Sequence, residues 1–359
     1  MTPSPSSAAV SAVPPPPITK AARVPAPLRE VPIRRLSLDD LPACLRLAQD
    51  RSWPPEEQKW RFLFEVGQVY GLADPGGDLA ATAVLTPYGP ELAVVGMVLV
   101  AARYNRQGLG RRLMQHALAE AHGAPVALYA TEAGRPLYES LGFRTLSTTT
   151  THIGYFQPRP VAAGAGRVRP ATPADSAAIF RLDAQVTGTN RQAVLDQLLL
   201  FAEYWWVLEH DGVIRGYAAA WRNIGQVVLG PVIAPDTAGA QQLVAAAGQA
   251  LGPGERLRLE VDARVPNLLA WAPLHGLQPT FTTSLMVQGL RPCRGTGHSC
   301  SAPSCWLLIR APITLRYRSS YVHFYRPGGH SRHAFNPQNS PRNRRRPRHW
   351  GGNRATPRR

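Results

Sequence analysis

Two stretches of this chain follow the same plan, and the second repeats the first after 134 or 135 residues. Each opens with a short strand that leads to Ser37 in one stretch and to Thr172 in the other, and both residue types cap helices. Asp40 and Asp175 follow three residues later, where a carboxylate stabilises the N-terminus of a helix. Both stretches also end on matching turns, Leu-Gly-Phe and His-Gly-Leu. Because these matching features recur at nearly the same offset, we predict a duplicated domain.

Composition divides the chain into five segments. Residues 1–28 are rich in Pro, Ser and Ala, so they bury too little apolar surface to become ordered. Residues 29–156 and 167–289 are the two repeated domains, and the Pro-, Ala- and Gly-rich residues 157–166 link them. Residues 290–359 form a basic low-complexity tail. We therefore predict two folded domains between disordered N- and C-terminal segments.

The net charge of +17 comes almost entirely from the tail. Residues 291–359 contain 15 Arg and no Asp or Glu, which leaves 25 basic against 23 acidic side chains in the remainder. This distribution excludes a basic nucleic-acid binder built from the whole chain. Two interpretations of the tail stay open: an arm that binds RNA or DNA, or the product of a shifted reading frame. We favour the second, because a nucleic-acid-binding arm that contains apolar stretches rarely lacks acidic residues altogether.

Several other classes of protein are excluded by composition. The longest apolar run, Leu92–Ala102, has 11 residues, which is short of the ~18 that a membrane span needs. The N-terminus lacks the pattern of a secretory signal. Three of the four cysteines lie in the tail without the spacing of a zinc site. We predict a cytoplasmic monomer or homodimer with no membrane partner and no bound metal, and we do not favour nucleic acid as a partner.

Hydrophobic periodicity predicts an α/β (α+β) fold for the first repeat, with a mixed, mostly antiparallel sheet flanked by helices. The nearly continuous apolar stretch 92–100 is typical of a central strand. The other expected strands are 31–36, 68–73, 79–86, 125–130, 143–149 and 151–156, and the expected helices are 38–49, 55–66, 109–121 and 134–140.

A glycine-containing turn joins the central strand to the helix at 109–121. Gly108 and Gly110 allow the backbone to approach a ligand closely. The first N–H groups of a helix have no partner within the helix and carry the positive end of its dipole. Arg106 and Arg111 add positive charge beside them. This strand, turn and helix together predict a pyrophosphate-binding site.

Three segments, Gly96–Val100, Arg106–Met114 and Leu137–Phe143, closely resemble the GNAT N-acetyltransferase superfamily. The resemblance covers about residues 31–156, and Leu229–Ala234 resembles the partner domain of tandem GNAT proteins. It implies that acetyl-CoA is the cosubstrate. The cofactor-binding residues that it implies are Val98, Leu99 and Val100 for the acyl and pantetheine part, and Asn105, Arg106, Gln107, Gly108, Leu109, Gly110 and Arg111 for the pyrophosphate.

The resemblance also implies catalytic positions. Tyr138 lies where many family members place a Tyr beside the CoA sulfur, as a general acid for the departing thiolate; packing in the core is the alternative. Some members carry a Glu general base on the central strand, but this chain has Val94 there. Glu91, Glu132 and His152 remain as candidate bases, although a solvated role is the simpler interpretation of each. A water chain could also remove the proton.

Candidate acceptor-site residues come from the same resemblance: Trp53, Trp60, Tyr88 and Glu132. For the aromatic residues, lining the acceptor pocket and packing in the core are equally good interpretations.

The second repeat lacks the chemical elements of the first. At the matching turn, Asp236 takes the place of the glycine-rich loop, and we predict that it caps the helix and repels phosphate. Ala272 stands at the counterpart of Tyr138. The carboxylates of Glu260 and Asp262 share a strand face, which we interpret as solvated rather than amine-binding. We therefore predict that this domain packs on the first and forms one wall of the acceptor site.

The leading hypothesis from the sequence is an acetyl-CoA-dependent N-acetyltransferase that acts on a small-molecule amine, or a peptide, by direct attack of the amine on the thioester. Because the base is unassigned, a non-catalytic acyl-CoA sensor or interaction protein is the alternative. Nucleic-acid binding through the tail is a third hypothesis.

Overall fold

The computed structural model describes residues 28, 30–161, 166–289 and 322–324. The predictions for residues 1–27 and for nearly all of the tail therefore lie outside the described residues. The first half contains β1 (Arg34–Arg35), η1 (Leu38–Asp40), α1 (Leu41–Asp50), α2 (Glu57–Val66), β2 (Gln68–Ala73), β3 (Leu79–Pro87), β4 (Ala93–Val100), η2 (Ala102–Tyr104), α3 (Leu109–Glu120), β5 (Val126–Ala130), α4 (Arg135–Glu139) and β6 (Arg144–Tyr155).

The second half repeats this order of strands and α-helices. It contains β7 (Arg167–Pro170), η3 (Pro173–Asp175), α5 (Ser176–Thr187), α6 (Gln192–Phe201), β8 (Tyr204–His210), β9 (Val213–Asn223), β10 (Gln226–Ala234), α7 (Thr237–Leu251), β11 (Arg256–Asp262), α8 (Pro266–Leu274) and β12 (Gln278–Gln288). A short strand, β13 (Val322–Phe324), lies within the segment predicted as a tail and pairs in parallel with β10.

Matching capping boxes open the two halves, as the sequence predicted. In the first half, the Ser37 side chain accepts a hydrogen bond from a backbone N–H of the first helical turn, and the Asp40 side chain accepts one from the Ser37 N–H. Thr172 and Asp175 repeat this reciprocal arrangement in the second half. Arg169 donates to the Asp175 carboxylate at 2.8 Å, and this hydrogen bond holds the pKa of Asp175 well below its usual range.

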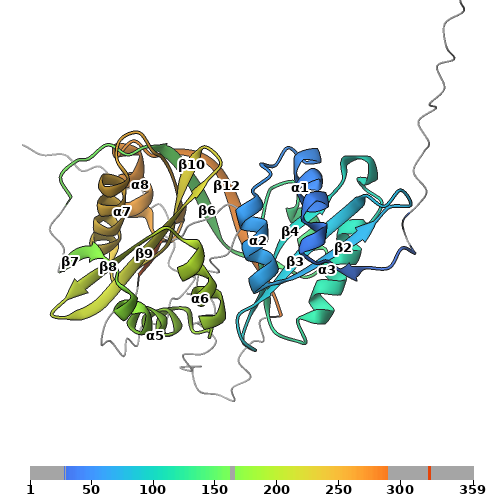
Figure 1. Ribbon diagram of the computed structural model, residues 1–359, viewed down its shortest axis with the longest axis horizontal. Coiled ribbons are helices and arrows are strands. Elements are labelled where there is room, and N and C mark those ends of the chain that lie inside the picture. The colour runs from blue at the N-terminus through green and yellow to red at the C-terminus, as the bar shows by residue number, and fades with distance from the viewer. Residues whose placement is uncertain (1–27, 29, 162–165, 290–321, 325–359) are drawn as a thin grey trace, which may run out of the picture. The chain divides into compact units, whose positions relative to one another are not determined.

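The halves share one sheet because each contributes its last strand to the other. The strand order is β1-β2-β3-β4-β5-β12-β6-β11-β10-β9-β8-β7. Strand β12 of the second half therefore lies between β5 and β6, and β6 of the first half pairs with β11 of the second. Figure 1 shows β6 in green and β12 in orange running together between the halves. The repeated unit was predicted from the sequence, but this exchange was not.

One predicted boundary was wrong. Strands expected at 143–149 and 151–156 form the single strand β6. Its central residues, Thr148–Thr151, are all β-branched and contain no turn-forming residue, so nothing interrupts the strand.

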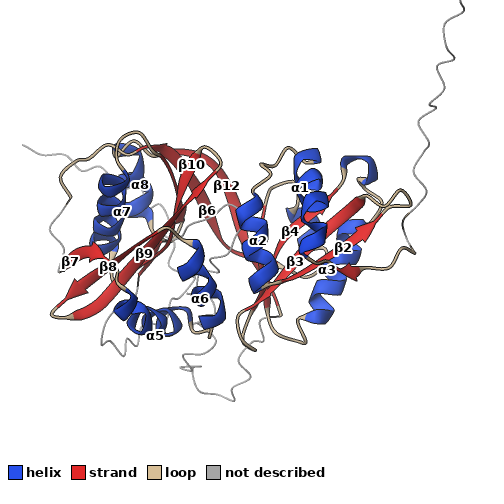
Figure 2. Cartoon of the chain, viewed as in Figure 1, coloured by secondary structure: helices blue, strands red, loops and turns tan. Residues whose placement is uncertain are grey.

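Helices of both halves flank the sheet (Figure 2). The second half also packs directly on the first, because Val194, Leu195 and Leu198 of α6 belong to the hydrophobic core of the first half. Phe201 of α6 contacts Phe62 of α2 with ring centroids 4.9 Å apart. The α2–α6 contact thus joins the halves a second time, beside the exchanged strands.

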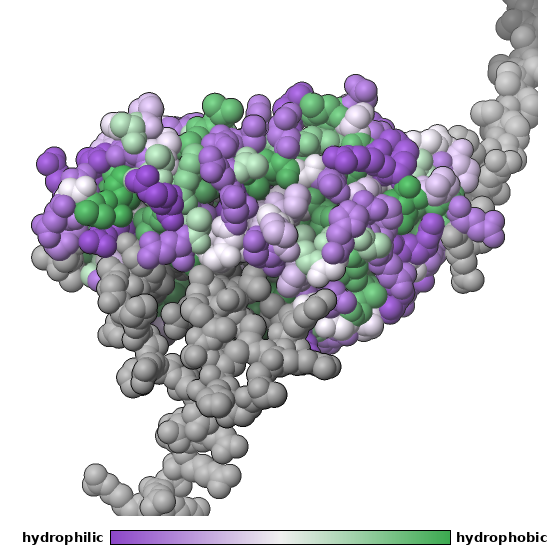
Figure 3. Space-filling view, turned by 90° about the horizontal axis from the view of Figure 1, so that it is seen from below, coloured by the Kyte–Doolittle hydropathy of each residue, from purple (hydrophilic) through white to green (hydrophobic). Residues whose placement is uncertain are grey.

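The face shown in Figure 3 carries hydrophobic patches separated by hydrophilic side chains. Within the described residues, the helices are too short or too polar to cross a bilayer.

Candidate active site

The central strand β4 separates from its neighbour β5 partway along its length. Ala93 and Val94 pair in parallel with Val126 and Ala127, and no further pair follows although both strands continue. On its other edge β4 stays paired with β3 as far as Val100. Among the described residues, the rest of the β4 edge that faces β5 therefore pairs with no strand. Its backbone N–H and C=O groups are available to an extended ligand.

A bulge in β4 lies within this separated part. The pairing of β4 with β3 shifts register between Thr82 and Val84, and Met97 adopts a positive φ of 46°. The Thr82 hydroxyl donates to the Met97 carbonyl oxygen at 3.1 Å and is buried with it. A bulge bends a strand and re-aims its groups. Here it accompanies the opening between β4 and β5.

The N-terminus of α3 follows and has no side-chain cap. Its N-cap residue, Gly108, adopts a left-handed φ of 81°, and the first intrahelical bond runs from the Arg112 N–H to the Gly108 carbonyl. The N–H groups before Arg112 are thus left for a ligand. A Cβ added at Gly108 would meet no atom within 4 Å. The loop therefore forms an open cradle of backbone donors, which fits an anionic group such as a pyrophosphate.

Side chains around the cradle serve different purposes. Arg106 is exposed, and Gln107 has a buried Oε1 atom with no hydrogen-bond partner in the described structure. Arg111 donates to the Ser140 hydroxyl at 2.7 Å, which ties α3 to the end of α4. Arg112 donates to backbone carbonyls of the N-terminal segment and is not directed to a ligand. The unsatisfied Gln107 oxygen, or its amide after a flip, suits a polar ligand at this loop.

Only some of the remaining predicted cofactor residues have side chains that a ligand could reach. Val98 and Val100 are half-buried on the open part of β4, whereas Leu99 is buried in the core. Asn105 is exposed and Leu109 is buried beneath the loop. Because the ligand would contact backbone groups here, a buried side chain does not exclude Leu99 or Leu109.

Tyr138 lies on the short helix α4 with 9% of its surface exposed. Its ring meets Phe143 edge-on at 6.0 Å. The preceding residue, Leu137, lies 3.3 Å from the position of a Cβ on Gly110. Helix α4 therefore packs against the start of α3, so Tyr138 belongs to the same corner of the fold as the cradle.

Val94, at the position where the family resemblance implies a general base, is buried in the core with 3% exposure and carries no carboxylate. Glu91 and Glu132 are exposed, in agreement with a solvated role. His152 is buried on β6, contrary to the solvated role expected for it, and its Nδ1 lies 3.2 Å from the Thr150 carbonyl oxygen. Burial lowers the pKa of His152, so this ring is neutral at pH 7.

The aromatic acceptor candidates divide by burial. Trp60 and Tyr88 are almost completely buried, which corresponds to the core-packing interpretation. Trp53 is half-buried and precedes α2. Tyr88 contacts the second half, because the Arg191 guanidinium lies 5.8 Å from the centre of its ring.

Sequence reasoning missed a buried ion pair at this contact. Arg191 donates to the Asp183 carboxylate at 2.7 Å, and the Tyr217 hydroxyl donates to the same group. All three side chains are buried, and desolvation raises the pKa of Tyr217 far above its usual range. An Asp within the apolar helix 176–187 was the available signal, since a buried carboxylate needs a partner. This cluster supports Tyr88 where the two halves meet.

The second half lacks the open cradle. Asp236 caps α7 by accepting the Gly239 N–H at 2.7 Å, as predicted from the sequence. Ala272, the counterpart of Tyr138, is buried in α8. Strand β10 pairs with β11 as far as Leu229, and its later residues, Val232–Ala234, pair with β13 instead. The second half therefore repeats the separated strands but not the anion site.

One expectation for β11 was wrong. Its carboxylates, Glu260 and Asp262, are buried rather than solvated. Both carboxylates are paired in the folded chain: Glu260 accepts from Arg258, and Asp262 accepts from Ser147 and Arg264.

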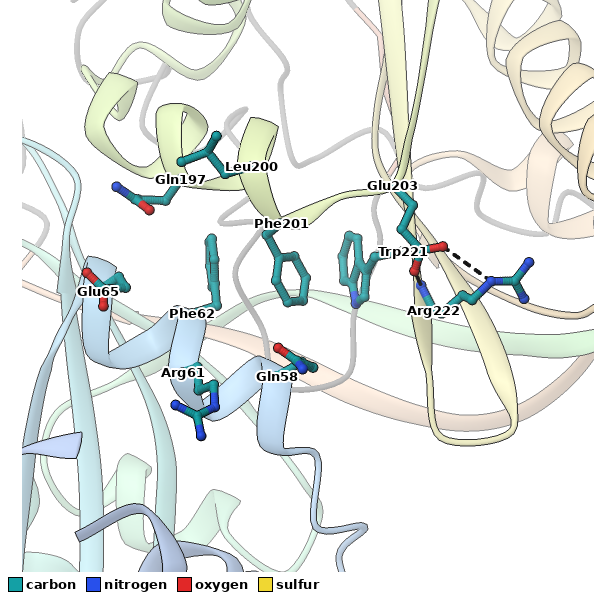
Figure 4. A pocket seen from close by; sticks show the side chains of 10 residues that line it. All are labelled: Gln58, Arg61, Phe62, Glu65, Gln197, Leu200, Phe201, Glu203, Trp221 and Arg222. Atoms are coloured by element: carbon teal, nitrogen blue, oxygen red, sulfur yellow. Dashed lines mark hydrogen bonds and ion pairs between the residues drawn. The ribbon is translucent and has the colours of Figure 1, made fainter. Parts of the chain in front are cut away.

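A separate pocket of about 460 Å³ lies between α2, α6 and β9. Figure 4 shows the rings of Phe62, Phe201 and Trp221 side by side, with Glu65 and Glu203 at opposite ends of the row. Arg222 pairs with Glu203 at 3.2 Å. None of the residues predicted to bind acetyl-CoA lines this pocket.

Comparisons with known proteins agree with this architecture. Two family models, each described as an acetyltransferase (GNAT) domain, match residues 65–145 and 179–299. An uncharacterized N-acetyltransferase of Bacillus subtilis, YitH, is 28% identical over 214 residues, which cover 58% of this chain and 75% of that protein.

Solved structures share the fold. A GCN5-related N-acetyltransferase from Sphaerobacter thermophilus is similar with a TM-score of 0.55 and 18% identity, over 74% of this chain and 97% of the other. A tandem GNAT protein from the clavulanic acid biosynthesis pathway gives a TM-score of 0.56 and 15% identity, over 72% and 98%. The chain is therefore a tandem member of the GNAT acetyltransferase superfamily, as the two family-model matches and these relatives indicate.

Proposed function

We propose that this protein is an acetyl-CoA-dependent N-acetyltransferase that acts on the amine of a small molecule or peptide. The observation that carries the proposal is the open edge of β4, which leads into the uncapped N-terminus of α3 at Gly108. This arrangement offers backbone groups to an extended acyl chain and then N–H donors to a pyrophosphate.

The proposed reaction is a direct transfer. The neutral amine attacks the thioester carbonyl, the new C–N bond forms, and the C–S bond breaks. Backbone N–H groups of the open part of β4 polarise the carbonyl as negative charge develops on its oxygen. Tyr138 donates a proton to the departing thiolate. The proton lost by the amine passes to water, because the base position on β4 holds Val94.

The proposal gives the two halves different roles. Residues 29–156 supply the acetyl-CoA site, and residues 167–289 supply a wall of the acceptor site. The packing of α6 into the first-half core supports this role. A cytoplasmic location and a monomeric or dimeric state stay predictions.

Release of the CoA thiol over a panel of amines tests the activity, with calorimetry of acetyl-CoA as the companion measurement. Turnover of at least one amine supports the enzyme. The buried Val94 favours one alternative, a non-catalytic acyl-CoA sensor. Tight binding of acetyl-CoA without turnover of any amine would favour that sensor, and absence of binding would exclude both.

A further inference from the structure

The loop between η2 and α3 has a strained backbone. Residues 105–108 make this connection, and Arg106 adopts a left-handed φ of 61° in addition to the left-handed Gly108. A residue that carries a Cβ is strained in this region, and such strain persists only where the surrounding structure fixes the chain. The cradle at Gly108 therefore needs firm attachments at both ends of its loop.

Side chains of α3 attach the loop at one end. Arg112 donates to the carbonyl oxygens of Leu28 and Val31 at 2.6 and 2.7 Å. Arg111 donates to the Ser140 hydroxyl. These bonds tie the first turn of α3 to the N-terminal segment and to the end of α4. The end at η2 needs a separate attachment.

Two aspartates hold the loop at η2. Asp50, the last residue of α1, accepts the Ala102 N–H at 2.6 Å. Asp74 directly follows β2 and accepts from the Arg103 guanidinium at 2.7 Å and from the Tyr104 hydroxyl at 3.0 Å. Every residue of η2 is therefore hydrogen-bonded to a carboxylate from another part of the first half.

The two oxygens of Asp74 have separate partners. Its Oδ1 accepts the N–H groups of Gly76 and Asp78 at 2.9 and 3.1 Å, which closes the turn between β2 and β3. Its Oδ2 accepts the bonds from Arg103 and Tyr104. One oxygen thus shapes the turn that Asp74 belongs to, and the other attaches η2 to that turn.

Asp74 is charged and largely enclosed. Its side chain is 9% exposed, and Tyr104 is buried beside it. Burial alone would raise the pKa of Asp74, but the hydrogen bonds from Arg103 and Tyr104 outweigh burial and lower this pKa below its usual range. A charged acceptor forms stronger hydrogen bonds than a neutral one. The attachment of η2 therefore combines a full charge, partial burial and two donors.

We propose that Asp74 is a positioning residue of the acetyl-CoA site. It holds η2, and η2 holds the start of the loop whose backbone donors face the pyrophosphate. Its effect on the cofactor passes through Arg103 and Tyr104. The inference rests on the proposed function, because the cradle is proposed to bind acetyl-CoA. It adds a residue outside the motif around Gly108, since Asp74 lies on the turn between β2 and β3.

The test uses the separate partners of the two oxygens. Asp74→Asn keeps one oxygen for the N–H groups of Gly76 and Asp78 and replaces the other by an NH₂ donor, which cannot accept from Arg103. Asp78→Asn is the matched control, because it removes the same charge from the same turn. The Asp78 side chain is 59% exposed and lies 3.7 Å from Arg103. Tyr104→Phe is a second variant, which removes one hydroxyl and keeps the ring.

Calorimetry of acetyl-CoA with the full chain gives the main readout. Asp74→Asn should bind about fivefold or more weakly, Tyr104→Phe about twofold more weakly, and Asp78→Asn like the wild type. Combining Tyr104→Phe with Asp74→Asn should add little further loss, because both changes break one attachment. Wild-type affinity in Asp74→Asn, or an equal loss in Asp78→Asn, would overturn the inference. If Asp74→Asn does not fold, wild-type affinity in Tyr104→Phe would overturn it.

Hydrogen exchange without ligand separates positioning from a general loss of stability. Residues 102–111 should exchange faster in Asp74→Asn than in the wild type, whereas α7 of the second half should be unchanged. Uniformly faster exchange along the chain would overturn the inference. In turnover, the KM for acetyl-CoA should rise at unchanged kcat, and a fall in kcat at unchanged KM would also overturn it.

The outcomes also distinguish this inference from the proposed function. If the wild type binds acetyl-CoA but acetylates no amine, the proposed enzyme fails, and the calorimetric comparison of Asp74→Asn with Asp78→Asn still decides the inference. If the wild type acetylates an amine and the two variants bind acetyl-CoA equally well, the inference alone fails. Absence of acetyl-CoA binding to the wild type would overturn both.

Discussion

Replacing Gly108 with Ala tests the cradle at the start of α3. Gly108 has a φ of 81°, and its added Cβ would meet no protein atom within 4 Å. The cost within the protein is therefore limited to the left-handed backbone, about 1–2 kcal/mol of the free energy of unfolding. The same methyl group would enter the space proposed for the pyrophosphate. We expect acetyl-CoA affinity to fall at least tenfold, which corresponds to about 1.4 kcal/mol.

Gly123 provides a matched control beyond the other end of α3. Its φ is 84°, and a Cβ there would also meet nothing within 4 Å. Gly123→Ala should therefore lose a similar amount of stability without losing acetyl-CoA affinity. Urea unfolding measures the stability of both variants, and calorimetry measures their affinity. Unchanged affinity in Gly108→Ala, or an equal loss in both variants, would refute the assignment of the cradle.

Three other predictions concern Tyr138, His152 and Asp236. Tyr138→Phe should lower kcat by about 10²-fold or more with acetyl-CoA affinity unchanged, because general-acid catalysis is lost; a wild-type rate would leave Tyr138 as a packing residue. Burial lowers the pKa of His152, so the unfolded chain binds more protons and stability should fall as pH drops below about 6.5. This fall, measured by urea unfolding between pH 8 and pH 5, should be smaller in His152→Gln, and an identical slope would contradict it. Asp236→Ala should cost about 0.5–2 kcal/mol of stability by removing the α7 cap, and the calorimetric titration should still lack a second acetyl-CoA site.

The elements with local signals were predictable from the sequence. Ser37 and Thr172 begin their helices with capping boxes, and Asp236 caps α7. These features depend on residues within one helical turn, so a short pattern determines them. The strand, turn and helix around Gly108 were recognised for the same reason.

Features that depend on distant pairing were not predictable. Strand β6 has a Thr-rich sequence with no feature that specifies its partner strands, so its exchange with β12 left no local signal. The exchange also places Thr149 and Thr151 of β6 opposite Asp262 and Glu260. The Asp183–Arg191 pair was missed because Asp183 lies within α5 and Arg191 precedes α6, so no local pattern links the two residues. In each case tertiary packing decided the outcome, not local propensity.

The stoichiometry of acetyl-CoA binding tests the central claim most directly. The claim is that the first half holds the acyl donor at Gly108, while Asp236 closes the equivalent position in the second half. Calorimetric titration of the full chain should give one acetyl-CoA per chain, and Gly108→Ala should abolish or strongly weaken that single site. A stoichiometry of two, or one site that Gly108→Ala leaves intact, would contradict the account.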